Sequence, residues 1–105
     1  MRIGTTPTQV FEIEEIGKDI PINEIKEVKI TYKQREKIIV EKHKEDCVIE
    51  TGKITTRLSQ EETFKFDSTK TVSIQLRLLT DNGDCLSTDV MTETLGACLD
   101  DEVLR

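Results

Sequence analysis

The chain has 105 residues, which suits one domain built around a single hydrophobic core. Hydrophobic residues make up 35%, charged residues 34%, and the formal net charge is -6, so the surface repels a phosphate backbone and we expect no nucleic-acid partner. Two Pro and five Gly exclude collagen-like and low-complexity chains, and no stretch approaches the roughly 18 apolar residues of a membrane span.

The N-terminal residues MRIGTTPTQ contain no apolar run of the kind that a signal peptide needs. We therefore expect a protein made in the cytoplasm, with no membrane partner. Reduced thiols agree with that expectation, because Cys47, Cys85 and Cys98 form no C-x-x-C pair and are odd in number.

The first third of the chain predicts strands. Phe11 and Ile13 alternate with acidic residues, and the segment 17–23 breaks the pattern and predicts a loop or an edge crossing. The segment EIKEVKITYK predicts a half-buried strand whose inner residues are Val28, Ile30 and Tyr32. Pro21 and the lysines of 26–33 resemble guards of an exposed sheet edge, so we expect an edge strand there.

The middle of the chain continues the alternation, with a turn at 51–52. The expected inner residues are Ile38, Val40, Ile54, Thr56 and Leu58, and the stretch between them contains Val48 and Ile49. Residues 59–62 (SQEE) have the S-x-x-E spacing of a capping box, in which Ser59 and Glu62 cap each other's backbone amides. Since TFKFD returns at once to alternation, we expect a single helical or 3₁₀ turn that crosses from one sheet to the other.

The clearest strand is TVSIQLRLL, and a long last strand follows it at CLSTDVMTETL. The dipeptide Asn82-Gly83 between them predicts a hairpin with a type I′ turn, because both residues tolerate positive φ. This turn places Leu78 opposite Leu86. The expected inner residues are Val72, Ile74, Leu76, Leu78, Leu86, Thr88 and Val90.

Short strands at spacings of about ten residues, without helical crossovers, predict an antiparallel all-β fold. We expect an immunoglobulin-like β-sandwich of six to eight strands with one short helical turn near 59–62, and a small β-barrel is the alternative. The sandwich spans 1–98 as a single domain, and 99–105 forms a short C-terminal tail.

The richest cluster of oxygen ligands is the loop around Asp81, Asn82 and Asp84. A calcium loop of EF-hand type needs its Gly at the sixth position and a Glu at the twelfth, between helices. Here Gly83 is third, no Glu occupies the twelfth position, and strands flank the loop. The sequence therefore favours a hairpin turn over a metal site.

The remaining candidates for chemistry are equally weak. A zinc site made of His43, Cys47, Cys85 and Cys98 lacks any close Cys pair, and we expect Cys47 and Cys85 to be small buried residues at strand starts. No G-x-S-x-G elbow or phosphate-binding glycine loop occurs, and adjacent carboxylates on a strand point to opposite faces. We predict no catalytic, cofactor-binding or metal-binding residues, and a protein that is not an enzyme.

Several segments occur in an order that resembles a known group: RIGTTPT, VKITY, LSQEETFKFD, VSIQLRLLT and the ending LDDEVL. The chain resembles small prophage-encoded proteins of Gram-positive, mainly clostridial, bacteria. Its strand order is also similar to immunoglobulin-like N-terminal domains of phage baseplate upper proteins. The resemblance covers nearly the whole chain and implies a non-enzymatic phage component of the head–tail or baseplate region.

Two hypotheses of function follow. In the first, the protein is a prophage structural or assembly protein that contacts other phage structural proteins or itself and becomes virion-associated. In the second, it is an accessory or regulatory binding module that recognises one host or phage protein.

Overall fold

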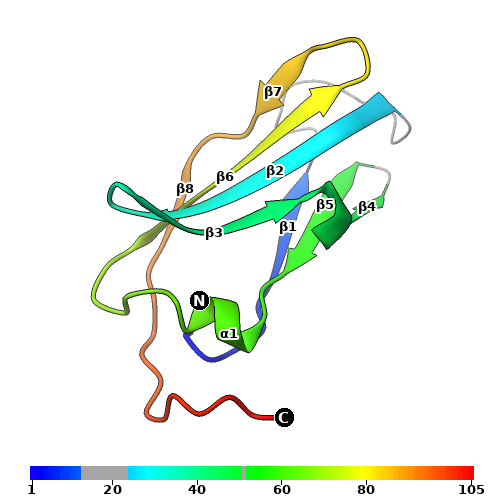
Figure 1. Cartoon of the computed structure of the whole chain (residues 1–105). Helices are drawn as coiled ribbons and strands as arrows, with labels where there is room; N and C mark the ends of the chain where they lie inside the picture. Colours follow the sequence, from blue (N-terminus) through cyan, green and yellow to red (C-terminus); the bar gives the residue numbers. More distant parts are fainter. Residues whose placement is uncertain (13–23, 51) are drawn as a thin grey trace.

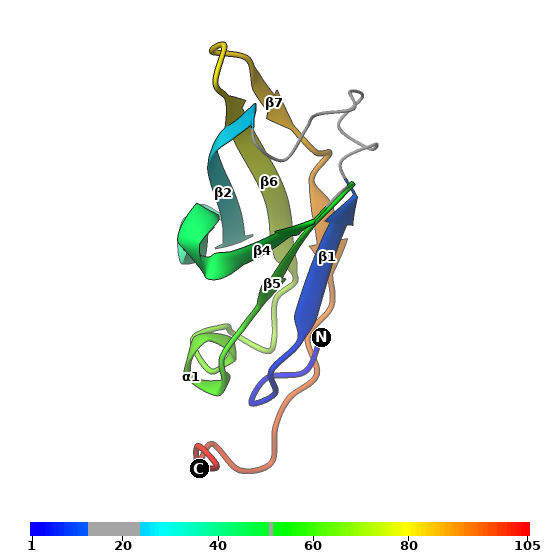
Figure 2. The same ribbon diagram turned by 90° about the vertical axis from the view of Figure 1, so that its right-hand side faces the viewer.

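The computed structural model describes residues 1–12, 24–50 and 52–105. Within these ranges the chain forms eight strands in two antiparallel sheets, which pack as two layers (Figures 1 and 2). No described strand pairs with a strand of the other sheet, so the sheets stay open and do not close into a barrel. The predicted all-β sandwich is confirmed. The predicted loop at 17–23, Pro21, Ile13 and the turn residue Thr51 lie outside the described residues.

The small sheet has three strands, in the order β1 (Thr8–Glu12), β5 (Lys53–Arg57), β4 (Cys47–Glu50). The large sheet has five strands, in the order β3 (Lys37–His43), β2 (Ile25–Gln34), β6 (Val72–Thr80), β7 (Cys85–Ser87), with β8 (Met91–Glu93) also paired to β6. A 3₁₀ turn, η3 (Lys44–Asp46), joins β3 to β4, and α1 (Gln60–Thr63) follows β5.

The first seven strands divide between the two sheets as in the immunoglobulin arrangement except for β2, and β8 has no counterpart in that arrangement. In that arrangement the first, second, fifth and fourth strands share one sheet, and the third, sixth and seventh share the other. Here β1, β5 and β4 are together, and so are β3, β6 and β7. Strand β2 instead lies in the second sheet, between β3 and β6.

The core lies between the sheets and is densest under β2 and β6. Strand β6 alternates throughout, and β2 alternates from Val28 onward, after an irregularity between Ile25 and Glu27. Their predicted inner residues are at most 2% exposed: Val28, Ile30, Tyr32, Val72, Ile74, Leu76 and Leu78. The predicted inner residues of β5 and its extension, Ile54, Thr56 and Leu58, are also buried. Each such aliphatic side chain favours folding by about 1.5–3 kcal/mol relative to exposure.

The prediction that 26–33 forms an edge strand is wrong. Strand β2 pairs with β3 on one side and β6 on the other, so it is central. Its lysines do not guard an edge. Lys29 and Lys33 are half-buried on the outer face of the sheet, where long stems can cover a central strand while their ammonium groups stay in water.

A bulge in β3 overturns the inward placement of Ile38. Val40 pairs with Tyr32, but the next pair is Ile38 with Lys33, so β2 advances one residue while β3 advances two. Ile39 is the extra residue. An extra residue in a strand turns the side chains on its far side to the opposite face of the sheet. Val40 is therefore buried, while Ile38 is 48% exposed on the outer face.

A second bulge divides the long strand predicted at 85–95 into β7 and β8. Leu78 pairs with Leu86, as predicted, and Ile74 pairs with Met91. Between these two pairs β6 advances four residues and the opposite segment advances five, so that segment contains one extra residue. Thr88 is buried as predicted, and its hydroxyl accepts a hydrogen bond from the Leu76 amide at 3.1 Å. Beyond it the facing reverses, and Val90 is 59% exposed instead of buried.

The hairpin at Asn82-Gly83 is present, but its turn is not type I′. Only Gly83 has positive φ (92°), and its amide donates to the Thr80 carbonyl at 3.0 Å. The Thr80 amide in turn donates to the Asp84 carbonyl at 2.9 Å. This is a three-residue loop, a type I turn closed by a left-handed glycine. Asn82 is not left-handed, and its side-chain oxygen accepts a hydrogen bond from the Thr80 hydroxyl.

The predicted capping box and the crossing between sheets are confirmed at α1. Ser59 Oγ accepts from the Glu62 amide at 3.1 Å, and Glu62 Oε1 accepts from the Ser59 amide at 2.9 Å. The short helix lies at the end of the molecule opposite to the β6–β7 hairpin, near the C-terminus (Figures 1 and 2). Gln60 holds the tail there, through bonds of its side-chain amide to the Leu104 carbonyl and amide at 2.8 and 2.9 Å.

Candidate protein-binding surfaces

In the oxygen-rich loop at 81–84, the Asn82 side chain and the backbone amides of Asp81 and Asp84 make hydrogen bonds. The Thr80 hydroxyl donates to Asn82 Oδ1 and accepts from the Asp84 amide at 3.1 Å. The Asp81 amide donates to the Glu24 carbonyl at 2.8 Å. These bonds brace the hairpin.

The sole His and the three thiols are placed on different elements. The Cys47 thiol donates to the His43 carbonyl at 3.2 Å, and burial raises the pKa of Cys47. Cys47 is half-buried, but Cys85 is exposed, contrary to prediction, because its strand lies at the sheet edge. Among the described residues, no three His, Cys, Asp or Glu side chains gather in a metal-binding group.

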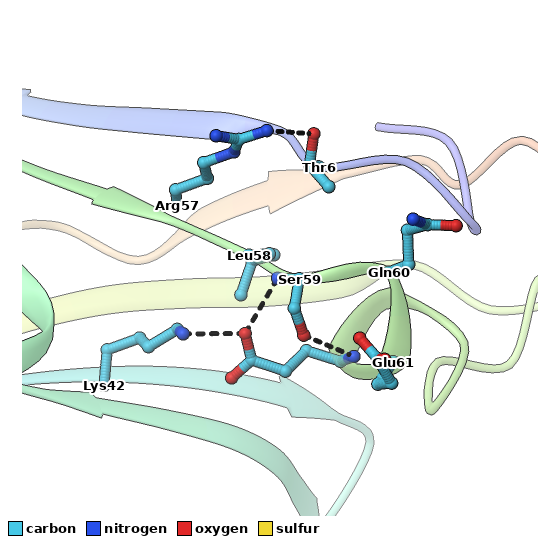
Figure 3. Close-up of a pocket in the computed structure, with 8 residues that line it drawn as sticks. Thr6, Lys42, Arg57, Leu58, Ser59, Gln60 and Glu61 are labelled. Atoms are coloured by element: carbon cyan, nitrogen blue, oxygen red, sulfur yellow. Dashed lines mark hydrogen bonds and ion pairs between the residues drawn. The ribbon is translucent and has the colours of Figure 1, made fainter. Parts of the chain in front are cut away.

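An open pocket of about 370 Å³ lies beside α1, and Figure 3 shows its lining. Lys42 Nζ donates to Glu62 Oε1 at 2.7 Å, the same oxygen that caps Ser59. Burial alone would raise the pKa of Glu62, but the bonds from Lys42 and Ser59 outweigh it and lower the pKa. Arg57 Nη2 donates to Thr6 Oγ1 at 2.9 Å. The bond between Lys42 and Glu62 ties β3 to α1 across this pocket, and Gln60 and Glu61 of its lining contact the C-terminal tail.

The outer face of the small sheet carries an exposed apolar row. Val10 and Val48 both pair with Thr55, so the three β-branched side chains lie side by side across β1, β5 and β4. Val10 is 55% exposed and Val48 is 59% exposed. We call these three residues the valine row. The neighbouring row on the same face is charged and consists of Glu12, Lys53 and Glu50.

The outer face of the large sheet carries a shallow groove of about 350 Å³. Its floor includes Thr31 of β2 and Gln75 of β6, and the two residues turned outward by the bulges, Ile38 and Val90, also line it. The cations that line the groove are Lys29, Lys33 and Arg77. We call the whole groove, with its cations, its polar floor and the two apolar residues, the basic groove.

The sequence carried a signal for one of these surfaces but not for the other. Val10-Phe11 and Val48-Ile49 are adjacent apolar pairs in short strands, and successive side chains of a strand point to opposite faces. One member of each pair must therefore face outward, which locates the valine row. The basic groove depends on two bulges, and no residue pattern announces either of them.

No helix among the described residues is long and apolar enough to cross a membrane. Comparisons with models of protein families, with curated proteins and with solved structures found no match to this chain.

Proposed function

We propose that this protein is a non-enzymatic structural or assembly component of a prophage, which acts by binding other proteins through the outer faces of its sandwich. The valine row is the observation that carries the proposal. Two valines that are more than half exposed lie in one row with Thr55, although the core is complete without them. Aligned apolar side chains rimmed by charges are typical of protein contact sites.

The charged rim supports the same interpretation. Lys53 and Glu50 form an exposed ion pair at 3.7 Å beside the valine row. Such a pair contributes little to stability, about 0–1 kcal/mol, but it can set the orientation and partner of a docked surface. The phage context comes from the sequence resemblance, which covers segments from both ends of the chain.

The test is the protein content of particles from an induced lysogen that carries this gene. We expect the chain in purified particles, or a large drop in particle yield when the gene is deleted. Val48→Asp should likewise remove the chain from particles or lower the particle yield, because it places a charge in the valine row. Ser68→Asp is the matched control, since it adds an equal charge at another exposed site. Normal particles without the gene, together with no copy of the chain in wild-type particles, would contradict the proposal.

A further inference from the structure

The basic groove has an unusual origin for a sheet surface. The bulge at Ile39 turns Ile38 outward, and the bulge after Thr88 turns Val90 outward. Two apolar side chains therefore project into solvent beside a polar floor. Neither side chain contributes to the core, so both are accessible to a ligand.

The charge of the groove is opposite to that of the whole chain. The chain carries a formal net charge of -6, yet the groove is lined by Lys29, Lys33 and Arg77 and by no carboxylate. Glu41 pairs with Lys29 at 3.4 Å from just outside. Lys33 forms no ion pair with any described acidic side chain. An acidic ligand with apolar ends therefore suits this surface.

The C-terminal tail of the chain has this chemistry. Leu99 is 109% exposed and Leu104 is 76% exposed, and the residues between them include three consecutive acids, 100–102. The two bonds from Gln60 grip only the backbone of Leu104. The leucine side chains thus point into solvent from a fixed position at one end of the molecule.

We propose that the basic groove binds the C-terminal tail, residues 99–105, of a second copy of this chain. The acids of the tail face Lys29, Lys33 and Arg77, and its leucines cover Ile38 and Val90. Because the groove lies on a sheet face and the tail lies at the α1 end, two copies can either exchange tails in a closed dimer or join head-to-tail. Repetition of the head-to-tail contact gives a ring if it closes and a filament if it does not. This inference rests on the proposed function and names one of its partners.

The test is a charge exchange, followed by sedimentation velocity on the full chain. The groove variant is Lys33→Glu with Arg77→Glu, and the tail variant is Asp101→Lys with Glu102→Lys. We expect wild-type protein to assemble, each variant alone to sediment as a 12.0 kDa monomer, and an equimolar mixture of the two to assemble again. The mixture restores complementarity at both surfaces, which a merely misfolded variant could not do.

Salt and a matched control sharpen the result. Added salt should dissociate the wild-type assembly, since exposed charges are screened beyond about 8 Å at physiological ionic strength. Lys26→Glu with Lys65→Glu makes the same change of charge at exposed sites outside the groove and should assemble normally.

Wild-type protein that stays monomeric up to about 1 mM would overturn the inference, and so would a groove variant that assembles unchanged. Either result leaves the proposed function standing if the chain is still found in phage particles and Val48→Asp still removes it.

Discussion

The two sheets of the sandwich share an alternating pattern but differ in which apolar side chains they leave exposed. In the large sheet, β6 and the part of β2 from Val28 onward place every second residue in the core, and mainly polar side chains, together with Leu79, cover their outer faces. In the small sheet, the three short strands bury Phe11 and Ile54 but leave Val10 and Val48 in solvent. The large sheet therefore supplies most of the core, and its exposed apolar residues, Ile38 and Val90, lie at its bulges, whereas the small sheet exposes apolar residues within its regular strands.

The difference follows from strand length and position. A long central strand with neighbours on both sides gains burial along its whole inner face, so strict alternation is favoured there. A strand of four or five residues at a sheet edge buries only one or two side chains, and an apolar residue on its outer face costs little. The comparison predicts that substitutions in the two sheets separate stability from binding.

The largest expected effect comes from the core of the large sheet. Leu76→Ala in β6, where Leu76 is fully buried, should lower the free energy of unfolding by about 2–5 kcal/mol, because the methyl groups are lost and a cavity remains. Val48→Ala in the small sheet should change it by no more than about 0.5 kcal/mol. Urea denaturation followed by circular dichroism measures both.

Equal losses at the two positions would contradict this division between the sheets. Ile54→Val is a useful intermediate, since Ile54 is fully buried in the small sheet. We expect a loss of about 0.5–1.5 kcal/mol there. That result would show that the small sheet contributes to the core through its inner face alone.

The same division explains how far the sequence could predict the structure. Alternation located β2, β5 and β6 and their buried residues correctly, because burial on one face imposes a period of two. It failed at Ile38 and Val90, because a bulge changes pairing without changing composition. It failed again at the edge assignment of β2, because strand order depends on long-range pairing that local residues do not encode.

Buried polar contacts were the other feature beyond prediction. Gln34 is 5% exposed and clamps the loop before β6, since its amide donates to the Asp67 carbonyl at 2.9 Å and its oxygen accepts from the Asp67 amide at 2.8 Å. At the surfaces, the adjacent apolar pairs carry a signal for the valine row that the sequence analysis did not use, whereas the basic groove required the three-dimensional structure.

The link between the sheets should be the next most sensitive feature. Ser59→Ala removes the cap of α1 and should cost about 1 kcal/mol, because the Glu62 amide loses its acceptor. Ser59→Asp retains an acceptor at that position and should recover most of the loss. Thermal unfolding of the two variants tests the cap, and an equal loss in both would show that the side chain at 59 acts through packing instead.

A smaller, pH-dependent effect is expected at the ion pair that joins β3 to α1. The folded-state pKa of Glu62 is lowered, so its contribution is complete above its unfolded pKa of about 4.3 and is lost as the pH falls through the folded pKa. Glu62→Gln keeps the capping oxygen but removes the charge that pairs with Lys42. The variant should therefore be less stable than wild type at pH 7, by no more than about 1 kcal/mol, and equal to it near pH 2.

Glu50→Gln is the matched control for this ion pair. Glu50 pairs with Lys53 at 3.7 Å in the small sheet, where both side chains are about half exposed. Its substitution should leave the unfolding midpoint nearly unchanged at either pH. A difference between wild type and Glu62→Gln that persists undiminished at pH 2 would mean that shape, and not charge, holds α1 to β3.

The smallest expected effect has the opposite sign. Tyr32 of β2 is fully buried, and its hydroxyl has no hydrogen-bond partner among the described residues. Burial, with the nearby Cys47, Glu62 and Glu93, raises the pKa of this phenol, so it stays neutral throughout the ordinary range. Tyr32→Phe keeps the ring, which lies 6.2 Å from that of Phe66, and removes only the unpaired hydroxyl.

We therefore expect Tyr32→Phe to be neutral or to raise the free energy of unfolding by up to about 1 kcal/mol, because burying an unpaired hydroxyl carries a desolvation penalty that no hydrogen bond offsets. Tyr32→Leu should be clearly destabilising, since it loses the ring as well. A loss in Tyr32→Phe that approaches the loss in Tyr32→Leu would mean that the hydroxyl is bonded in solution, through a water molecule held between the sheets. The interior between the two sheets would then hold water beside the large sheet, and the inner face of that sheet would not be the uniformly dry layer that the burial of β2 and β6 indicates.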